Sequence, residues 1–523
     1  MQTNFLVFIV DQLNAQHLGC YGNPQIETPH IDALAASGWS ATQCHVASPI
    51  CMPNRASLMT GRMPSVHGVR HNGIPLSLGS RTFVDALRQA GYATALCGKS
   101  HLQNITNKKP LPHPARPDHG HDAHLPYPGN YLQECIDTWR ADPAFEPQLP
   151  FYGFGSVDLA IEHGDCPEGH YLRWLKQNHP QALALAGKDN ATPTPDYALA
   201  AVGQAWRTRL PEELHPTAWI ADRAIARIES AAEQSRPFFV YCSFPDPHHP
   251  YTPPGRYWDM YKPEDVTLPA SFYAQPSVPH LAWLHQQRDA GQAVKNSQAC
   301  FAVSEREARE AVALGYGSLS FIDSNIGRVL AALKASGQAE QTVVIFTSDH
   351  GEFAGDHALL LKGSLHYDSL TRTPFIWNGP GVAAPGRQDN ALLSSIDISS
   401  TILDQAGVEP YNGMQGRSFL PLIEGREDFV RRDHLLIEEE GQRTYFGFDE
   451  PVRMRSLLSG QYRLSLYDGE DWGELYDRQA DPIESRNLWD DPAHASLKHE
   501  LLGQLAREML RLSETSPAPT ALA

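Results

Sequence analysis

The sequence contains no hydrophobic run long enough to cross a bilayer, which takes about 20 consecutive apolar residues. Its first apolar run, residues 5–10, is short and is followed at once by Asp11. No basic segment precedes this run, so the N-terminus lacks the pattern of a signal peptide. We therefore expect a buried strand here, no membrane association and a cytoplasmic protein.

Paired cysteine motifs are also absent. The eight cysteines form no CxxC pair, and their spacing is not that of a disulfide-rich domain. Thiols scattered in this way suit a reducing compartment, where they stay free. An even number still permits disulfides in an exported protein. The cysteines are Cys20, Cys44, Cys51, Cys97, Cys135, Cys166, Cys242 and Cys300.

Clustered positive charge is the third absence. The formal net charge is -18, with 42 Lys and Arg residues against 60 Asp and Glu residues. Nucleic acids and anionic membranes attract clustered Lys and Arg, so we expect neither as a partner. A small anionic substrate would depend on positive charge within its own site.

The chain of 523 residues is too long for one ordinary core, which favours a large α/β domain with a smaller second one. Residues 4–10 and 342–347 are apolar runs typical of strands buried on both faces of a parallel sheet. Asp11 and Asp349 follow these runs. Ligand sites in such sheets lie beyond the carboxyl ends of the strands, so we expect the two aspartates to meet.

Helical periodicity alternates with these strands, which indicates a doubly wound sheet. After about Asn412 the pattern changes to short strands and a closing helix. The expected helices are residues 29–37, 82–90, 217–235, 304–335 and 493–512, and the late strands are residues 453–458, 462–467 and 474–477.

Residues 108–130 are rich in Pro, Gly and His and have little hydrophobic periodicity. This composition predicts a long solvated loop with a functional role. A second metal site is the alternative, because four histidines lie close together in the sequence. They are His113, His119, His121 and His124.

The segment from Cys51 to Arg55 reads CMPNR and is followed by ASLMTGR. It resembles the signature of the type I sulfatases of the alkaline phosphatase superfamily. Further similar motifs appear in the family's order, and the similarity runs from about Asn4 to about Leu488, with a poorly matched stretch between residues 103 and 210. These motifs are VDQ at residues 10–12, GKSH at 98–101, DPHHP at 246–250 and TSDHGE at 347–352.

The resemblance implies an α/β fold with a large mixed, mostly parallel sheet flanked by helices. The catalytic domain would comprise residues 1–410, with an inserted substrate-loop region at residues 103–210. Residues 411–523 would form a C-terminal subdomain, a smaller antiparallel sheet with a helix. Related enzymes are often oligomers, so a homo-oligomer is expected.

The resemblance also implies a post-translational change at Cys51. A formylglycine-generating enzyme would convert this residue to formylglycine, whose hydrated aldehyde provides the nucleophile. Arg55 would orient residue 51. The alternative from the residues alone is that Cys51 is a buried structural thiol.

The implied metal ligands are Asp11, Gln12, Asp349 and His350, with Cys51 completing the shell. Oxygen ligands of this kind suit Ca²⁺ or Mn²⁺. Gln12 and His350 stand where many sulfatases have Asp and Asn, and they resemble the phosphonate monoester hydrolase branch. Alternatively, Asp11 could cap the next turn and Asp349 could lie in a loop.

Four further residues would act on the substrate, and all are carried over from the motifs. Lys99 and Lys362 would hold sulfate oxygens, His101 would assist deprotonation at residue 51, and His248 would hold or protonate the leaving-group oxygen. His249 competes with His248 for that role.

Asn72 resembles an active-site Asn of phosphonate monoester hydrolases and choline sulfatases, but it could equally be a turn residue before Gly73.

The resulting hypothesis is an arylsulfatase-like, promiscuous hydrolase of small-molecule sulfate monoesters. Lys99 and His101 favour sulfate, whereas Gln12, His350 and Asn72 favour a phosphonate monoester hydrolase or phosphodiesterase. A hypothesis of another class is a non-catalytic sulfatase-like binding protein in which Cys51 stays a thiol.

Overall fold

The computed structural model describes residues 2–109, 125–444 and 446–522. Its centre is a nine-stranded sheet with the order β12-β2-β11-β9-β1-β7-β4-β5-β6. The strands are β1 (Asn4–Val10), β2 (Trp39–Ala41), β4 (Ala93–Gly98), β5 (Ser156–Ile161), β6 (Glu168–Gly169), β7 (Phe238–Phe244), β9 (Thr342–Ser348), β11 (Phe375–Asn378) and β12 (Arg387–Asp389). The two strands predicted from apolar runs, β1 and β9, lie side by side.

The middle of the sheet is parallel. Strands β9, β1, β7, β4 and β5 all run in one direction, whereas β11 and β6 pair antiparallel to their neighbours. Alternate residues of β1 enter two separate cores, with Phe8 in one and Val7 in the other. Burial on both faces explains the continuous apolar run and confirms the predicted mixed, mostly parallel sheet.

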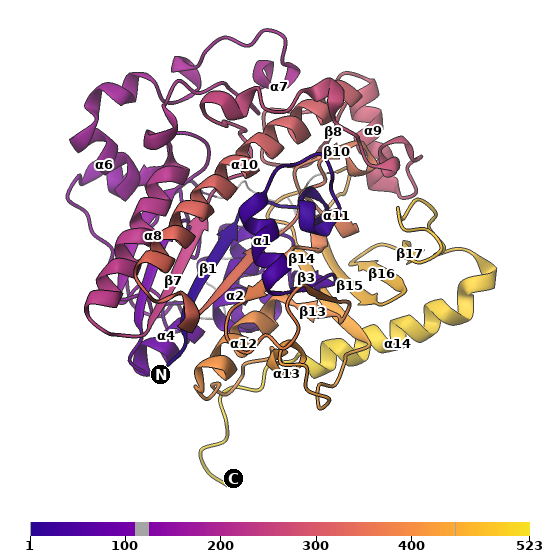
Figure 1. The fold of residues 1–523 in the computed structure, drawn as a ribbon. Helices are drawn as coiled ribbons and strands as arrows, with labels where there is room; N and C mark the ends of the chain where they lie inside the picture. Colours follow the sequence, from indigo (N-terminus) through magenta and orange to yellow (C-terminus); the bar gives the residue numbers. More distant parts are fainter. Residues whose placement is uncertain (1, 110–124, 445, 523) are drawn as a thin grey trace.

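Helices cover both faces of this sheet (Figure 1). One face carries α1 (Pro29–Ser37), α8 (Pro216–Glu233) and α10 (Glu305–Ala335). The other carries α2 (Cys51–Thr60), α4 (Phe83–Gln89) and α12 (Ser395–Ala406). The long α10 begins with a capping box in which Ser304 and Glu307 exchange hydrogen bonds. The expected helices therefore form within a few residues of their predicted ends.

The poorly matched stretch at residues 103–210 is more than an inserted loop, because it supplies β5 and β6 to the main sheet. It also contains α5 (Ile136–Ala141), α6 (His170–Asn178) and α7 (Ala198–Ala201). Around the predicted long loop, residues 102–109 and 125–135 contain no helix or strand. The four histidines His113, His119, His121 and His124 lie outside the described residues.

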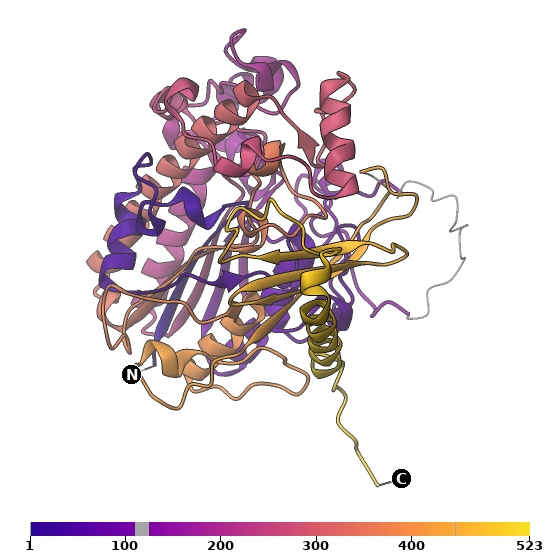
Figure 2. The same ribbon diagram turned by 90° about the vertical axis from the view of Figure 1, so that its right-hand side faces the viewer.

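The C-terminal part forms a second, antiparallel sheet, as predicted (Figure 2). Its strands are β14 (His434–Glu440), β15 (Arg453–Ser459), β16 (Tyr462–Tyr467) and β17 (Gly473–Asp477). Helix α14 (Ala495–Arg511) packs against it through Leu501 and Leu505. The boundary at residue 410 stays a prediction.

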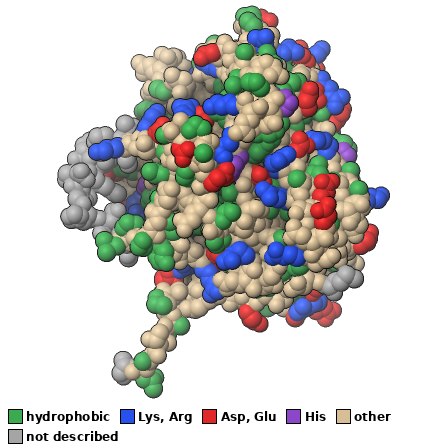
Figure 3. All heavy atoms as spheres, turned by 90° about the vertical axis from the view of Figure 1, so that its left-hand side faces the viewer, with side chains coloured by type: hydrophobic (Ala, Val, Ile, Leu, Met, Phe, Trp, Pro, Cys, Tyr) green, Lys and Arg blue, Asp and Glu red, His purple; other side chains and the backbone are tan. Residues whose placement is uncertain are grey.

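The surface agrees with the charge analysis. On the face drawn in Figure 3, Lys and Arg side chains lie among Asp and Glu side chains rather than in one basic patch. None of the helices in the described residues has both the length and the hydropathy needed to cross a bilayer.

A buried arginine links the C-terminal sheet to the start of helix α11 (Asp368–Thr371). Arg463 of β16 is 1% exposed and pairs with Glu484 at 2.6 Å and with Glu474 at 3.2 Å. Its guanidinium also lies over the ring of Tyr367, which comes from the catalytic part of the chain. Glu484 in turn accepts a hydrogen bond from the backbone of Asp368 at 3.0 Å.

Replacing Arg463 by Met should destabilise the protein by about 3–5 kcal/mol, because two buried carboxylates lose their cation. Urea unfolding followed by circular dichroism measures this loss. The matched control is Arg486→Met, which removes an arginine 73% exposed and paired with Asp491. It should change stability by less than about 0.5 kcal/mol. Equal effects of the two substitutions would contradict the role of Arg463.

Candidate active site

A cavity of about 420 Å³ lies where the central parallel strands end. Residues that follow four different strands reach it or its floor, as expected for an open α/β sheet. Asp11 follows β1, Lys99 and His101 follow β4, His248 follows β7 and Asp349 follows β9.

Two buried carboxylates form the floor. Val10 and Ser348 are register partners on adjacent parallel strands, so Asp11 and Asp349 emerge side by side. Together with Cys51 and His350 they form a cluster whose ligand atoms all lie within 4.8 Å of one another. The predicted meeting of the two aspartates is therefore confirmed.

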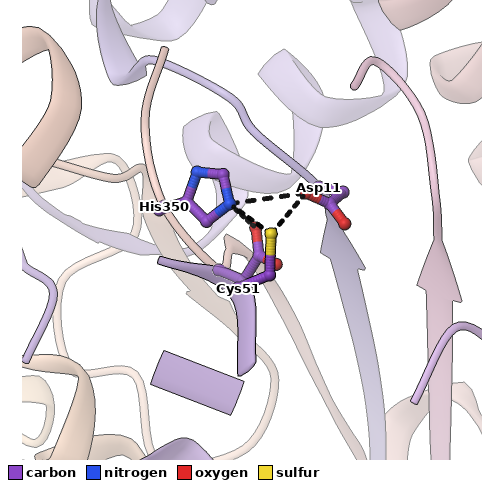
Figure 4. A group of neighbouring side chains, drawn as sticks. Asp11, Cys51 and His350 are labelled. Atoms are coloured by element: carbon purple, nitrogen blue, oxygen red, sulfur yellow. Dashed lines mark hydrogen bonds and ion pairs between the residues drawn. The ribbon is translucent and has the colours of Figure 1, made fainter. Parts of the chain in front are cut away.

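Figure 4 shows Asp11, Cys51 and His350 pointing toward one another. His350 Nε2 lies 3.0 Å from the Cys51 Sγ and 3.5 Å from Asp11 Oδ1. The other ring nitrogen, Nδ1, contacts the carbonyl of Gly351 at 2.9 Å and would donate its hydrogen there. This contact leaves Nε2 able to act as a ligand. Two carboxylates, an imidazole and residue 51 form a donor set that fits a divalent cation.

Arg55 compensates the negative charge of this cluster. Its Nε donates to Asp349 at 2.7 Å, and its second terminal nitrogen lies 3.4 Å from Asp11. Burial alone would raise the pKa of Asp11, but Lys99, together with other cations, holds that pKa well below its usual value. The arrangement favours the ionised form of the Asp11 carboxylate in the protein interior.

Cys51 opens helix α2 and is buried. Burial acts to raise the pKa of its thiol, yet the nearby charges of Lys362, His350 and Lys99 together hold that pKa well below the ordinary value. Asn72 accepts a hydrogen bond from the backbone of Met52 at 3.1 Å and lines the same cavity. Asn72 is therefore both a local backbone partner and part of the cavity wall.

Lys99 contacts Oδ2 of Asp11, whereas Cys51 and His350 lie near Oδ1 of the same carboxylate. Gly98, before Lys99, has φ 105°, and a Cβ there would come within 1.9 Å of the Ser243 carbonyl oxygen, so the chain requires glycine. The Lys99 ammonium contacts Asp11 and lies 2.6 Å from His163 Nε2.

His163 is a cavity residue that the sequence reasoning missed. Its ring stacks on that of His248 with centroids 3.7 Å apart. His163 lies two positions after the last residue of β5. Asp11 and Asp349 likewise lie just beyond the carboxyl ends of β1 and β9. That position relative to a strand could have identified it.

Lys362 lies beside His248, with Nζ 2.8 Å from its Nε2. Burial, followed by the charge of His163 and then of Lys362, lowers the pKa of His248 well below its usual value. His248 lines the cavity, whereas His249 lies near Gln12 and Gln298 at 3.3 Å and 2.8 Å. The geometry thus favours His248 over His249 as the residue that faces a substrate.

Gln12 does not point its oxygen at the carboxylate cluster. Its Oε1 accepts from Lys362 at 2.7 Å, and its amide nitrogen donates to Glu352. Burial raises the pKa of Glu352 to about 7. Glu352 closes the TSDHGE motif but had no assigned role, and it now accounts for the orientation of Gln12.

The rim of the cavity comes partly from the C-terminal part of the chain. Glu440 at the end of β14 and Gln442, Arg443 and Phe446 in the following connection line it. His101 lines the opposite wall with a left-handed backbone, φ 59°. Five predicted site residues therefore line one cavity, namely Cys51, Asn72, His101, His248 and Lys362, and Asp11, Asp349 and His350 form a cluster with Cys51.

Comparison with known proteins agrees with this geometry. The sequence profile of the family described as "Sulfatase" matches residues 3–408. A second profile, described as "N-sulphoglucosamine sulphohydrolase, C-terminal", matches residues 355–511.

Relatives align with nearly the whole chain. The multifunctional alkaline phosphatase superfamily protein PehA of Trinickia caryophylli is 30% identical, covering 94% of this chain and 92% of that protein. The arylsulfatase of Clostridium perfringens is 28% identical, covering 88% and 91%. The crystal structure of the phosphonate monoester hydrolase of Agrobacterium radiobacter superposes with a TM-score of 0.76 at 25% identity, covering 98% and 96%. With a family profile matched over three quarters of its length, this chain belongs to the sulfatase family of hydrolases.

Proposed function

We propose that this enzyme hydrolyses small-molecule sulfate monoesters in an arylsulfatase-like and promiscuous manner, with Cys51 converted to formylglycine by a formylglycine-generating enzyme. One observation carries the proposal. Residue 51 belongs to a cluster of side chains that could hold a metal ion, and it lines the same cavity as Lys362 and His248, which contact each other. A sulfate group needs this combination of a nucleophile and surrounding positive charge.

Asp11, Asp349, His350 and residue 51 would hold one divalent cation, Ca²⁺ or Mn²⁺. The cation would polarise a sulfate oxygen and stabilise negative charge in the transition state. The nitrogen ligand from His350 favours Mn²⁺. Ligation by Gln12 stays a prediction, since its oxygen accepts from Lys362 here.

The modified residue would supply two hydroxyl groups, one to attack sulfur and one whose deprotonation later expels sulfate. Lys99 and Lys362 would bind sulfate oxygens from opposite sides, and Arg55 would fix the two aspartates. His248, together with the adjacent Lys362 ammonium, would hold a proton toward the leaving oxygen. His101 would take the proton from residue 51.

A phosphonate monoester hydrolase or phosphodiesterase is the second candidate. Gln12, His350 and Asn72 favour it, as does the likeness to phosphonate monoester hydrolase structures. A third candidate, a non-catalytic binding protein, requires an unmodified Cys51.

A cytoplasmic location is also proposed. In the described residues, all eight cysteines carry free thiols, which supports a reducing compartment. We also propose that the protein forms a homo-oligomer, a proposal that rests on the family resemblance alone.

Replacing Cys51 by Ala should lower kcat on an aryl sulfate by on the order of 10⁶-fold, because the nucleophile is lost. Peptide mass spectrometry of the wild-type protein should show the change from thiol to aldehyde at residue 51. Cys20→Ala, at a thiol remote from the cavity, is the control and should keep full activity. An unmodified, inactive wild-type protein after coexpression with the maturation enzyme would support the binding-protein alternative.

An aryl sulfate and an aryl phosphonate monoester with the same leaving group should separate the two catalytic candidates. We expect a higher kcat/KM for the sulfate, since Lys99 and His101 match the sulfatase motif. The shared alcohol isolates the effect of the transferred group. A higher kcat/KM for the phosphonate would instead support the phosphonate monoester hydrolase candidate, which Gln12, His350 and Asn72 favour.

Replacing Asp349 by Asn should weaken metal affinity by more than about 100-fold, because a charged ligand becomes a neutral amide. Elemental analysis of the dialysed protein measures bound Mn²⁺ and Ca²⁺ directly. Asp165→Asn is the matched control, since Asp165 is also buried but binds Gly187 and Trp206 instead. Retention of metal by the Asp349 variant would rule this residue out as a ligand.

A further inference from the structure

The turn that carries His101 is organised around one buried carboxylate. Glu134 accepts hydrogen bonds from three consecutive backbone N–H groups. These come from His101 at 2.6 Å, Leu102 at 3.0 Å and Gln103 at 2.9 Å. Successive N–H groups that converge in this way form a concave anion site, and Glu134 supplies its anion from within the chain.

This interaction takes place away from water. Glu134 is 2% exposed and His101 is 6% exposed. Burial raises the pKa of Glu134, and the backbone N–H groups of this turn act against that rise. Without the carboxylate, three buried donors would lack partners, which costs about 1–3 kcal/mol for each.

The segment that presents Glu134 is itself held in place. The backbone of Gln133 donates to the side chain of Gln103 at 2.9 Å, and its carbonyl accepts from Trp139 at 2.9 Å. The Gln133 side chain accepts from the backbone of Gln148 at 2.6 Å. The backbone next to Glu134 is therefore held in place by hydrogen bonds.

The ring of His101 has few fixed partners of its own, so its backbone conformation contributes to its direction. Within the described residues, Nδ1 of its ring is buried and has no hydrogen-bond partner. Its backbone is left-handed, with φ 59°, a conformation that costs a non-glycine residue free energy. The bonds to Glu134 are therefore what stabilises the backbone conformation from which the ring enters the cavity.

We propose that Glu134 is a positioning residue that fixes His101 for the release of sulfate. The inference rests on the proposed function, in which His101 takes a proton from the second hydroxyl of residue 51. As that O–H bond breaks, the carbon to oxygen double bond forms and the ester C–O bond to sulfate breaks, so sulfate leaves with the bonding electrons. Attack on the substrate precedes this step and does not need the proton transfer to His101.

The test combines Glu134→Gln with a matched control, Glu310→Gln. Glu310 is also a buried carboxylate, and it accepts backbone N–H groups from Ala198 at 3.1 Å and Leu199 at 2.9 Å. It does not line the catalytic cavity. Both substitutions should cost stability, but only the first should alter the turn at His101. Glu134→Asp is the milder variant if the amide variant does not fold.

The first measurement is amide hydrogen exchange, followed by mass spectrometry of a peptide covering residues 99–104. It uses the protein with unmodified Cys51, so it is independent of activity. Exchange should be slow in the wild type and in Glu310→Gln and faster in the Glu134 variants. Unchanged protection in the Glu134 variants would overturn the proposal.

The second measurement is pre-steady-state hydrolysis of an aryl sulfate by the matured enzyme. In the Glu134 variant, kcat should fall about 100-fold while kcat/KM stays nearly constant, so a burst of released alcohol precedes slow turnover. Equal losses in kcat and kcat/KM, or the same burst in Glu310→Gln, would overturn the proposal. A wild-type enzyme that leaves aryl sulfates intact would refute the proposed function, and hydrogen exchange would still test the bonds of Glu134.

Discussion

Two buried carboxylates side by side are the constraint on which the site depends. Asp11 and Asp349 are forced together by the register of two adjacent parallel strands, and like charges in the protein interior repel strongly. Arg55 lies between them and neutralises part of this charge without water. Because Arg55 and residue 51 lie one turn apart on α2, the same helix places both the proposed nucleophile and the counter-charge. The strand register thus fixes the positions of the two aspartates.

The sequence predicted the parts of this architecture that follow from local patterns. Two apolar runs predicted the strands β1 and β9. Because an aspartate follows each run, Asp11 and Asp349 were expected to lie close together. The helical pattern predicted from residue 304 corresponds to α10, whose start at Ser304 the structure shows to be a capping box. These features depend on neighbours in the chain, so they can be read without the fold. Cys51, His101, His248 and Lys362, which were all matched by motif, line one cavity.

What the sequence could not predict depends on contacts between distant segments. The position of His163 after β5 could have marked it as a site residue, but its stacking on His248 could not be predicted, nor could the orientation of Gln12 by Glu352. Glu134 belongs to a stretch with weak family similarity, and its importance arises only where it meets the turn after β4. A buried polar group needs hydrogen-bond partners, and no local sequence pattern identifies partners that are distant in the sequence.

The cavity is lined from two parts of the chain, so sequence changes in these two parts would have different consequences. Asp11, Lys99, His248 and Asp349 follow strands of the large sheet, whereas Gln442, Arg443 and Phe446 reach the cavity from the connection after β14 in the C-terminal part. Insertions or substitutions in that connection alter the wall met by the organic half of an ester and leave the strand register intact. A family built in this way can diversify its substrates while it keeps one chemistry.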